Sequence, residues 1–164
     1  MQQLCAPPLA RHPVSLRPPQ AVPVKRYVYI TRRSHFSAAH RLENPAWSIE
    51  KNMEVFGKCA SPNYHGHNFY IEVTLRGEVD PDTGMVVDFS DLKRIVDRHL
   101  IDQVDHKNLN LDVPFLRGVN PTAENLVVKF WEQLAPHFPS GMLYKITLYE
   151  TAKNVVEYYG PSED

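Results

Sequence analysis

The architecture of this chain follows from one segment, His65-Gly66-His67-Asn68-Phe69-Tyr70-Ile71-Glu72-Val73-Thr74-Leu75-Arg76. From His65 onward every second side chain is an imidazole or an apolar group, and most residues between them are polar or charged. Successive side chains of a strand point to opposite faces of a sheet, so this alternation predicts one long strand with a single apolar face. Both histidines lie at the start of that face.

The sequence on either side of this segment predicts further strands. A first strand is expected at 27–33, where β-branched and aromatic residues gather. The turn Asp80-Pro81-Asp82-Thr83-Gly84 predicts a hairpin in which 85–88 returns beside the long strand. A last hairpin is expected from 143–150 and 155–159.

Two helices are predicted between these hairpins. Ser90 can cap a helix at 91–101, whose apolar positions follow the helical period. Asn120 can cap a second helix, in which Pro121 suits the first helical position. The stretch 43–57 has no clear period and predicts an irregular loop with one helical turn. This order of elements indicates an α+β domain with an antiparallel sheet and helices on one face.

Composition excludes several classes of protein. The 164 residues, 43% hydrophobic and with a formal net charge of −1, fit one globular domain. They lack the basic footprint of a nucleic-acid-binding protein. No apolar run approaches the roughly 20 residues that cross a bilayer. The two cysteines, Cys5 and Cys59, do not make a disulfide framework, and free thiols fit a reducing cytoplasm.

The first 26 residues differ from the rest. They contain six prolines, and no Asp or Glu occurs before Glu43. We expect a disordered, basic tail at 1–26, or the product of a misassigned start codon. The prolines oppose the helix of a transit peptide, and a secretory signal would need an apolar core. The folded domain is then 27–160, followed by a short tail at 161–164.

Three histidines are candidate metal ligands. His65 and His67 share one side of the predicted strand, and His40 follows a Ser/Ala stretch upstream. Three neutral imidazoles leave one tetrahedral position open, which is typical of catalytic zinc. Spacing alone leaves a second possibility, that these rings are solvated or hydrogen-bonded without a metal.

Cys59 stands six positions before His65, and its role has three readings. It can be an acid–base group or nucleophile beside the open metal position. It can be the fourth ligand of a closed, structural zinc site. It can also be a buried thiol without a chemical role.

Several charged residues carry both functional and ordinary interpretations. Asp105 and His106 could relay protons with a thiol, although adjacent residues seldom hydrogen-bond each other well. Glu150 could accept two parallel hydrogen bonds from a ring with an N–H and an amino group, or be a solvated charge. Glu124 is most simply a favourable charge in the first turn of a helix.

Several motifs together resemble those of the 6-pyruvoyl-tetrahydropterin synthase family, in family order. They are Phe36-Ser37-Ala38-Ala39-His40-Arg41-Leu42, Phe56-Gly57-Lys58-Cys59, His65-Gly66-His67-Asn68, Gly77-Glu78-Val79-Asp80-Pro81, Asp105-His106-Lys107-Asn108-Leu109 and Tyr149-Glu150-Thr151. The resemblance covers the chain from Tyr27 to Gly160. It implies the tunnelling fold (T-fold), a four-stranded antiparallel sheet with two helices packed on one face, which oligomerises into a barrel. It also implies a homohexamer built as a dimer of trimers.

The resemblance implies a role for each candidate residue. The zinc ligands are His40, His65 and His67. The catalytic base is Cys59, and the partners that complete its triad from a neighbouring subunit are Asp105 and His106. The pterin anchor is Glu150, and the residues lining the pterin pocket are Thr122 and Glu124.

The implied activity is elimination of triphosphate from 7,8-dihydroneopterin triphosphate to give 6-pyruvoyl-tetrahydropterin, with Zn²⁺ as cofactor and a cytoplasmic location. A relative, the 6-carboxytetrahydropterin synthase of queuosine biosynthesis, shares the metal and triad pattern. The five residues between Cys59 and His65 favour the pyruvoyl enzyme, whereas the Pro121-Thr122 pair favours the queuosine enzyme. Release of a glycolaldehyde-type fragment from dihydroneopterin is a related alternative. From another class, a non-catalytic zinc-stabilised binding protein predicts Cys59 as a ligand and no turnover.

Overall fold

The alternating segment forms strand β2 (His65–Gly77), which pairs antiparallel with β1 (Val28–His40) along its whole length. In this computed structural model, which describes residues 25–162, the register runs from Val28 opposite Gly77 to His40 opposite His65. The first strand is longer than predicted and continues to His40. Its last residues are small and weakly β-forming, and it is the pairing with β2 that keeps them extended.

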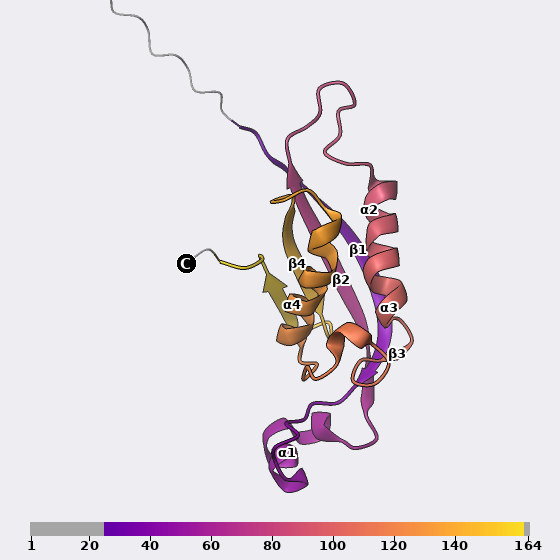
Figure 1. The fold of residues 1–164 in the computed structure, drawn as a ribbon, viewed down its shortest axis with the longest axis vertical. Coiled ribbons are helices and arrows are strands. Elements are labelled where there is room, and N and C mark those ends of the chain that lie inside the picture. Colours follow the sequence, from indigo (N-terminus) through magenta and orange to yellow (C-terminus); the bar gives the residue numbers. More distant parts are fainter. Residues whose placement is uncertain (1–24, 163–164) are drawn as a thin grey trace, which may run out of the picture.

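The sheet contains five strands in the order β3-β1-β2-β4-β5 (Figure 1). The additional strands are β3 (Lys107–Asn108), β4 (Leu143–Tyr149) and β5 (Val155–Tyr158). β4 pairs with β2 and β5 pairs with β4, both antiparallel, while β3 is parallel to β1. The α+β class is therefore confirmed, but the four-stranded antiparallel sheet is corrected to a five-stranded mixed one. The extra strand is the two-residue segment 107–108, which lies between the two predicted helices.

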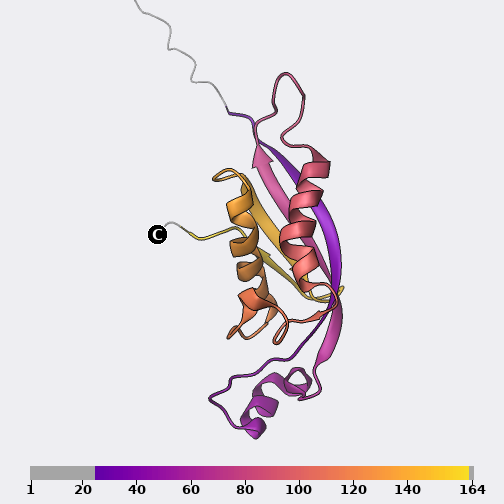
Figure 2. The same ribbon diagram turned by 45° about the vertical axis from the view of Figure 1, so that its right-hand side comes forward.

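Two helical segments cover one face of the sheet, as expected, and both views show them lying side by side (Figures 1 and 2). The first is α2 (Phe89–Val96), which continues through a π-helical turn at Asp97–Ile101 into α3 (Asp102–Val104). The second is α4 (Ala123–Leu134). A further helix, α1 (Ile49–Phe56), lies beyond the end of the sheet where β1 finishes and β2 starts. This helix forms where the sequence predicts an irregular loop with one helical turn.

The core lies between the sheet and these two helical segments. The apolar face of β2 is completely buried and supplies Phe69, Ile71, Val73 and Leu75. The Phe36 ring from β1 stacks on Phe69 with centroids 4.8 Å apart. Burying side chains of this size stabilises the fold by about 1.5–3 kcal/mol each. The alternation in sequence thus predicts this half of the core.

The hairpin predicted at 80–88 is wrong. Residues 85–88 form no strand, because β2 already has β1 on one edge and β4 on the other. The turn itself is present and closes on its own backbone. Gly84 N–H donates to the Asp80 carbonyl at 2.8 Å, and Asp80 N–H donates to the Met85 carbonyl at 2.9 Å.

Both predicted helix caps are displaced by two residues. Asp88, not Ser90, caps α2: its carboxylate accepts a hydrogen bond from Ser90 N–H at 2.6 Å. Thr122, not Asn120, caps α4 by accepting from Asn125 N–H at 3.3 Å. Pro121 therefore precedes the cap, and the Asn120 side chain is free for other contacts.

The predicted tails fall largely outside the described residues. Of the tail at 1–26, only Lys25 and Arg26 are described, and of the tail at 161–164 only Pro161 and Ser162. Cys5 also lies in the part that is not described. Among the helices of residues 25–162, none has the length and apolar character to cross a membrane.

Candidate metal centre

The three predicted histidines meet at one end of the sheet. His40 is the last residue of β1 and lies directly opposite His65, and His67 lies opposite Ala38. Because all three occupy alternate positions on the helix-covered face, their rings converge. One ligand nitrogen from each lies within 4.8 Å of the others. The ring centroids are 4.5 Å apart for His40 and His65 and 4.9 Å for His65 and His67.

A backbone carbonyl fixes the tautomer of His40. The ring is 1% exposed, and its Nδ1–H donates to the Pro121 carbonyl at 2.9 Å. A carbonyl can only accept, so Nδ1 carries the proton and Nε2 keeps a free lone pair. Metal-binding histidines typically use such a bond to a carbonyl or carboxylate to set the ring.

The remaining buried nitrogens have no hydrogen-bond partner among the described residues. They are His40 Nε2, both ring nitrogens of His65, and His67 Nε2. Buried polar atoms are nearly always paired, so a group of unpaired ring nitrogens calls for an explanation. An ion bound by all three rings would satisfy one nitrogen from each, and imidazole is a usual zinc ligand. The residues present therefore fit Zn²⁺.

The environment lowers the pKa of His40 and of His65 and so favours the neutral rings that metal ligation requires. Burial away from water lowers the pKa of His40, and the neighbouring His65 and His67 lower it further. The bond to the Pro121 carbonyl and the charge of Glu150 act in the opposite direction. Burial, followed by the proximity of His67, also lowers the pKa of His65.

Glu150 lies at the rim of this group, immediately after β4. Its carboxylate oxygen is 3.9 Å from His40 Nε2, and its side chain is 22% exposed. It is not one of the residues whose ligand atoms converge within 4.8 Å. A partly exposed carboxylate beside the open side of the centre remains available to a ligand.

Cys59 lies in a short 3₁₀ helix, Gly57–Ala60, that connects α1 to the chain entering β2. Its backbone carbonyl accepts a hydrogen bond from Leu42 N–H at 2.8 Å, which ties this helix to the end of β1. The thiol is half-buried and free, and it is not part of the converging group. In this conformation the sulfur does not complete a four-ligand site.

Asp105 and His106 are joined to each other, contrary to the expectation for adjacent residues. The carboxylate is 2.9 Å from His106 Nδ1, and its other oxygen accepts from Ser37 N–H at 2.8 Å. The contact is possible because His106 has a left-handed φ of 56°, a conformation that costs a non-glycine residue about 1–3 kcal/mol. The Ser37 N–H, followed by His106, lowers the pKa of Asp105.

His106 and one of the three converging histidines, His67, line one open groove of about 480 Å³, together with Gly66 and Asn68. The His106 side chain is 82% exposed. The structure therefore brings His106 and a metal ligand to the same groove, while Cys59 is not among the residues that line it.

Thr122 and Glu124 lie at the start of α4. Thr122 is half-buried and uses its hydroxyl to cap the helix. Glu124 is exposed in the first helical turn. Thr122 follows the residue whose carbonyl orients His40, so this helix end borders the metal group.

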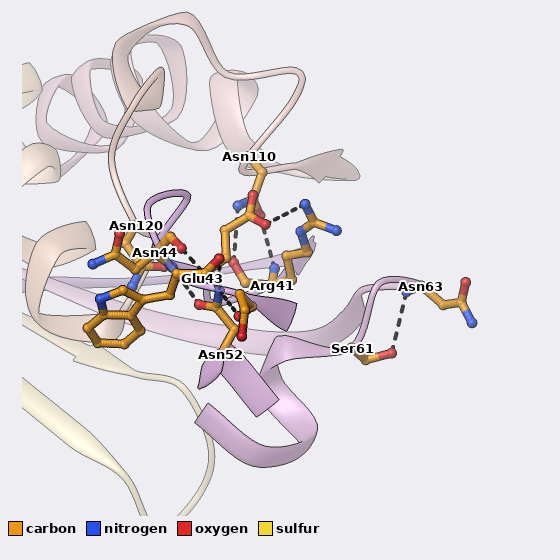
Figure 3. Close-up of polar contacts among 10 residues, drawn as sticks. Arg41, Glu43, Asn44, Asn52, Ser61, Asn63, Asn110 and Asn120 are labelled. Carbon is orange, nitrogen blue, oxygen red and sulfur yellow. Dashed lines mark hydrogen bonds and ion pairs between the residues drawn. The ribbon is translucent and has the colours of Figure 1, made fainter. Parts of the chain in front are cut away.

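Sequence reasoning missed the residues that support His40. Arg41 and Glu43 are held by the side chains of Asn110 and Asn120 from two separate loops, and Asn44 is held by Asn52 of α1 (Figure 3). The Pro121 carbonyl has no signature in the sequence, because every residue carries a carbonyl. Asparagine is also a common loop residue, so neither Asn110 nor Asn120 is distinguishable by type.

Several known proteins are similar to this chain in sequence. The sequence profile of 6-pyruvoyl tetrahydropterin synthase matches residues 29–161. The chain belongs to this family. It is 47% identical to the human 6-pyruvoyl tetrahydrobiopterin synthase over 131 residues, which is 80% of this chain and 90% of the human one. The prediction of this enzyme family from the sequence motifs is thus confirmed.

Two other relatives place the chain within the family. The structure of the Caenorhabditis elegans 6-pyruvoyl tetrahydropterin synthase superposes with a TM-score of 0.79 at 43% identity, covering 84% of this chain and 98% of that one. A dihydroneopterin monophosphate aldolase from Pyrococcus furiosus is 31% identical over 122 residues, covering 74% of this chain and 88% of the relative. Relatives with different names are therefore similar to this chain.

Proposed function

We propose that this protein is a 6-pyruvoyl tetrahydropterin synthase. It converts 7,8-dihydroneopterin triphosphate to 6-pyruvoyl-tetrahydropterin and triphosphate, using Zn²⁺ held by His40, His65 and His67. This proposal is carried by the convergence of three imidazoles, each with a buried ring nitrogen that has no hydrogen-bond partner among the described residues, in a chain 47% identical to the human synthase. Neither observation is sufficient alone, since buried histidines and shared folds both occur without this activity.

The residues divide the chemistry between them. Bound at this centre, Zn²⁺ would act as a Lewis acid toward the hydroxyl groups of the substrate side chain. Cys59 removes the proton from the side-chain carbon as its C–H bond breaks, and the triphosphate leaves with the electrons of its C–O bond. Hydrogens then rearrange within the molecule, so no external redox cofactor takes part. General acid–base help of this kind contributes about 10²–10⁴-fold in rate.

Other residues orient the substrate and the base. Glu150 accepts two parallel hydrogen bonds from the pterin ring, which turns the reacting carbon toward the thiol. Thr122 and Glu124 border the ring. Asp105 holds His106 in the groove, and the pair completes the triad of a neighbouring subunit's Cys59 in a homohexamer. An intersubunit triad agrees with the absence of Cys59 from the residues lining the groove beside His106.

Two features support oligomerisation. On the β3 side, β1 is paired only at Ala38 and Ala39, and β5 lies at the other edge of the sheet. The helices cover one face of the sheet only, as both views show (Figures 1 and 2). Unpaired strand edges invite pairing with another chain, and a dimer of trimers would close these edges into barrels.

The decisive experiment is incubation of the Zn²⁺-loaded protein with 7,8-dihydroneopterin triphosphate and identification of the products by mass spectrometry. We expect a pyruvoyl side chain and one triphosphate per turnover. A carboxylate with release of acetaldehyde would identify a 6-carboxytetrahydropterin synthase instead. No turnover of any pterin, together with Cys59 bound to zinc, would identify a non-catalytic zinc protein.

A second candidate activity is aldol cleavage of a dihydroneopterin. The similarity of this chain to the Pyrococcus furiosus dihydroneopterin monophosphate aldolase supports it. The identity of 31% to that enzyme against 47% to the human synthase ranks it second. Incubation with dihydroneopterin monophosphate in parallel separates the two, because cleavage releases a two-carbon aldehyde and leaves phosphate esterified.

A further inference from the structure

The chain leaving β1 loses its strand partner on one side just before the metal group. β3 is two residues long and pairs only with Ala38 and Ala39. The last backbone bond on that side joins Leu109 N–H to the Ala39 carbonyl at 2.8 Å. His40 and the residues after it therefore need other contacts on this edge.

Asn110 supplies the first of these contacts. Its side-chain oxygen accepts from Arg41 N–H at 2.9 Å, and its side-chain nitrogen donates to the Arg41 carbonyl at 3.0 Å (Figure 3). One amide thus satisfies both backbone groups of the residue after His40, as a neighbouring strand would. Asn110 is itself held, since its N–H donates to the Asn108 side chain at 3.0 Å.

Asn120 supplies the second contact. Its side-chain oxygen accepts from Glu43 N–H at 3.0 Å. Its backbone carbonyl accepts from the Asn125 side chain at 2.9 Å. The next residue is Pro121, whose carbonyl sets the His40 ring. Asn120 therefore ties the loop that orients the ring to the chain that carries the ring.

Arg41 extends this support toward a second ligand. Its guanidinium forms an ion pair with Glu43 and lies over the Tyr64 ring at 5.2 Å from the centroid. Tyr64 immediately precedes His65 and has a left-handed φ of 61°. The clamped segment thus also contacts the chain that enters β2.

We propose that Asn110 and Asn120 are positioning residues for the metal centre. They hold His40 with its Nε2 beside His65 and His67 before an ion binds. The inference rests on the proposed function, because it takes the three-histidine group as a Zn²⁺ site. If the His40 ring were free to move, a smaller fraction of molecules would hold it in the position that binds Zn²⁺. The apparent dissociation constant for Zn²⁺ is inversely proportional to that fraction, so it would rise.

The test measures Zn²⁺ affinity of the full chain by competition with a chromophoric chelator. Asn110→Leu and Asn120→Leu remove the amide contacts at similar volume. We expect each to raise the dissociation constant about tenfold, the lower end of what supporting residues contribute to metal sites. Asn120→Asp keeps an acceptor oxygen for Glu43 N–H and should bind Zn²⁺ within about twofold of wild type, since the bond is preserved.

A matched control comes from the same region. Asn52 clamps both backbone groups of Asn44 in the same way, at 2.7 and 3.0 Å, but farther along the chain from His40 (Figure 3). Asn52→Leu should lower the melting temperature and leave Zn²⁺ affinity unchanged. Saturation with Co²⁺ should give the wild-type absorption spectrum in every variant, because the ligand set stays the same.

Each outcome bears on the inference. Wild-type affinity in both Asn110→Leu and Asn120→Leu overturns it, and so does equal weakening in Asn52→Leu. A changed Co²⁺ spectrum also overturns it, because the amides would then alter the ligand set. Should Asn110→Leu fail to fold, Asn120→Leu and Asn120→Asp carry the test. These results leave the proposed function intact, whereas a wild-type protein that binds no Zn²⁺ overturns both.

Discussion

His40 has its role set by one bond. The Pro121 carbonyl accepts a hydrogen bond from Nδ1–H at 2.9 Å, and this leaves Nε2 facing the other two rings. His65 has no such bond on either nitrogen, and His67 has none on Nε2, within the described chain. The first ligand is thus oriented by the fold, and an ion would orient the others.

In the proposed mechanism, the thiol of Cys59 takes part in catalysis and not in metal binding. It lies outside the converging group, so Cys59→Ala should abolish turnover and keep about one Zn²⁺ per chain, as three imidazoles are enough to hold it. Metal analysis by mass spectrometry alongside product formation checks this. Loss of stoichiometric zinc in the variant would instead support a closed four-ligand site.

The lowered pKa values of His40 and His65 predict how stability depends on pH in the metal-free protein. Below about pH 6.5 the unfolded chain binds protons that the folded rings resist, so the free energy of unfolding falls as pH drops. Above about pH 6.5 the rings are neutral in the folded and the unfolded chain, and this loss of stability is absent. Urea unfolding between pH 5 and pH 8 measures the slope.

A matched variant isolates the cause of this slope. His65→Gln removes one of the two rings with a lowered pKa and should flatten the pH dependence. The same protonation should release Zn²⁺ from the loaded protein below about pH 6. Retention of the metal at pH 4.5 would contradict ligation by imidazole.

At the scale of elements, the residue that caps α2 is not the capping residue nearest to the start of its apolar period. Asp88 and Ser90 both suit a cap, and the structure uses Asp88 because its extended backbone places the carboxylate at Ser90 N–H. Ser90 lies inside the helix. The helix therefore begins earlier than its apolar period suggests.

This difference is directly testable. Asp88→Ala should lower the free energy of unfolding by about 0.5–2 kcal/mol, the usual contribution of an N-cap. Ser90→Ala should change it by less than about 0.5 kcal/mol, because an exposed helical position tolerates alanine. Chemical denaturation of both variants gives the comparison. A larger loss of unfolding free energy in Ser90→Ala than in Asp88→Ala would indicate that Ser90 caps the helix, as predicted from the sequence.

At the scale of the whole molecule, the sheet is unfinished. The edge of β1 pairs with β3 only at Ala38 and Ala39, and β5 ends the sheet on the other side. The face opposite the helices carries charged and aromatic side chains such as Arg33, Tyr70 and Glu72. Arg33 contacts both of the others, with its guanidinium 4.7 Å from the Tyr70 centroid and 3.8 Å from the Glu72 carboxylate. Such a surface suits association with further copies of the chain.

A shared active site makes a specific prediction about mixed oligomers. Cys59→Ala and His106→Ala should each be inactive alone, but subunit exchange between them should restore part of the activity. Some sites in the mixture then combine an intact thiol with an intact imidazole. Activity after mixing, with exchange followed by native mass spectrometry, is the measurement. Confirmed exchange without recovery would place the whole triad in one subunit.

The order of residue types along the chain was enough to predict much of this protein. The period of two in residues 65–76 predicts β2 and its buried face, and it places His65 and His67 on one side of it. The family motifs predicted the three histidines that the fold then brings together. These features depend on the order of residues along one element, which the chain carries without reference to its neighbours.

Contacts between distant segments account for the rest. Residues 85–88 could not become a strand once β4 had taken the free edge of β2, and β3 exists only because residues 107–108 meet β1. The Pro121 carbonyl reaches His40 across 81 positions of sequence. The Asn110 amide reaches Arg41 across 69. Partners that far apart have no fixed spacing to reveal them, since only the packing of helices on the sheet sets which backbone groups meet.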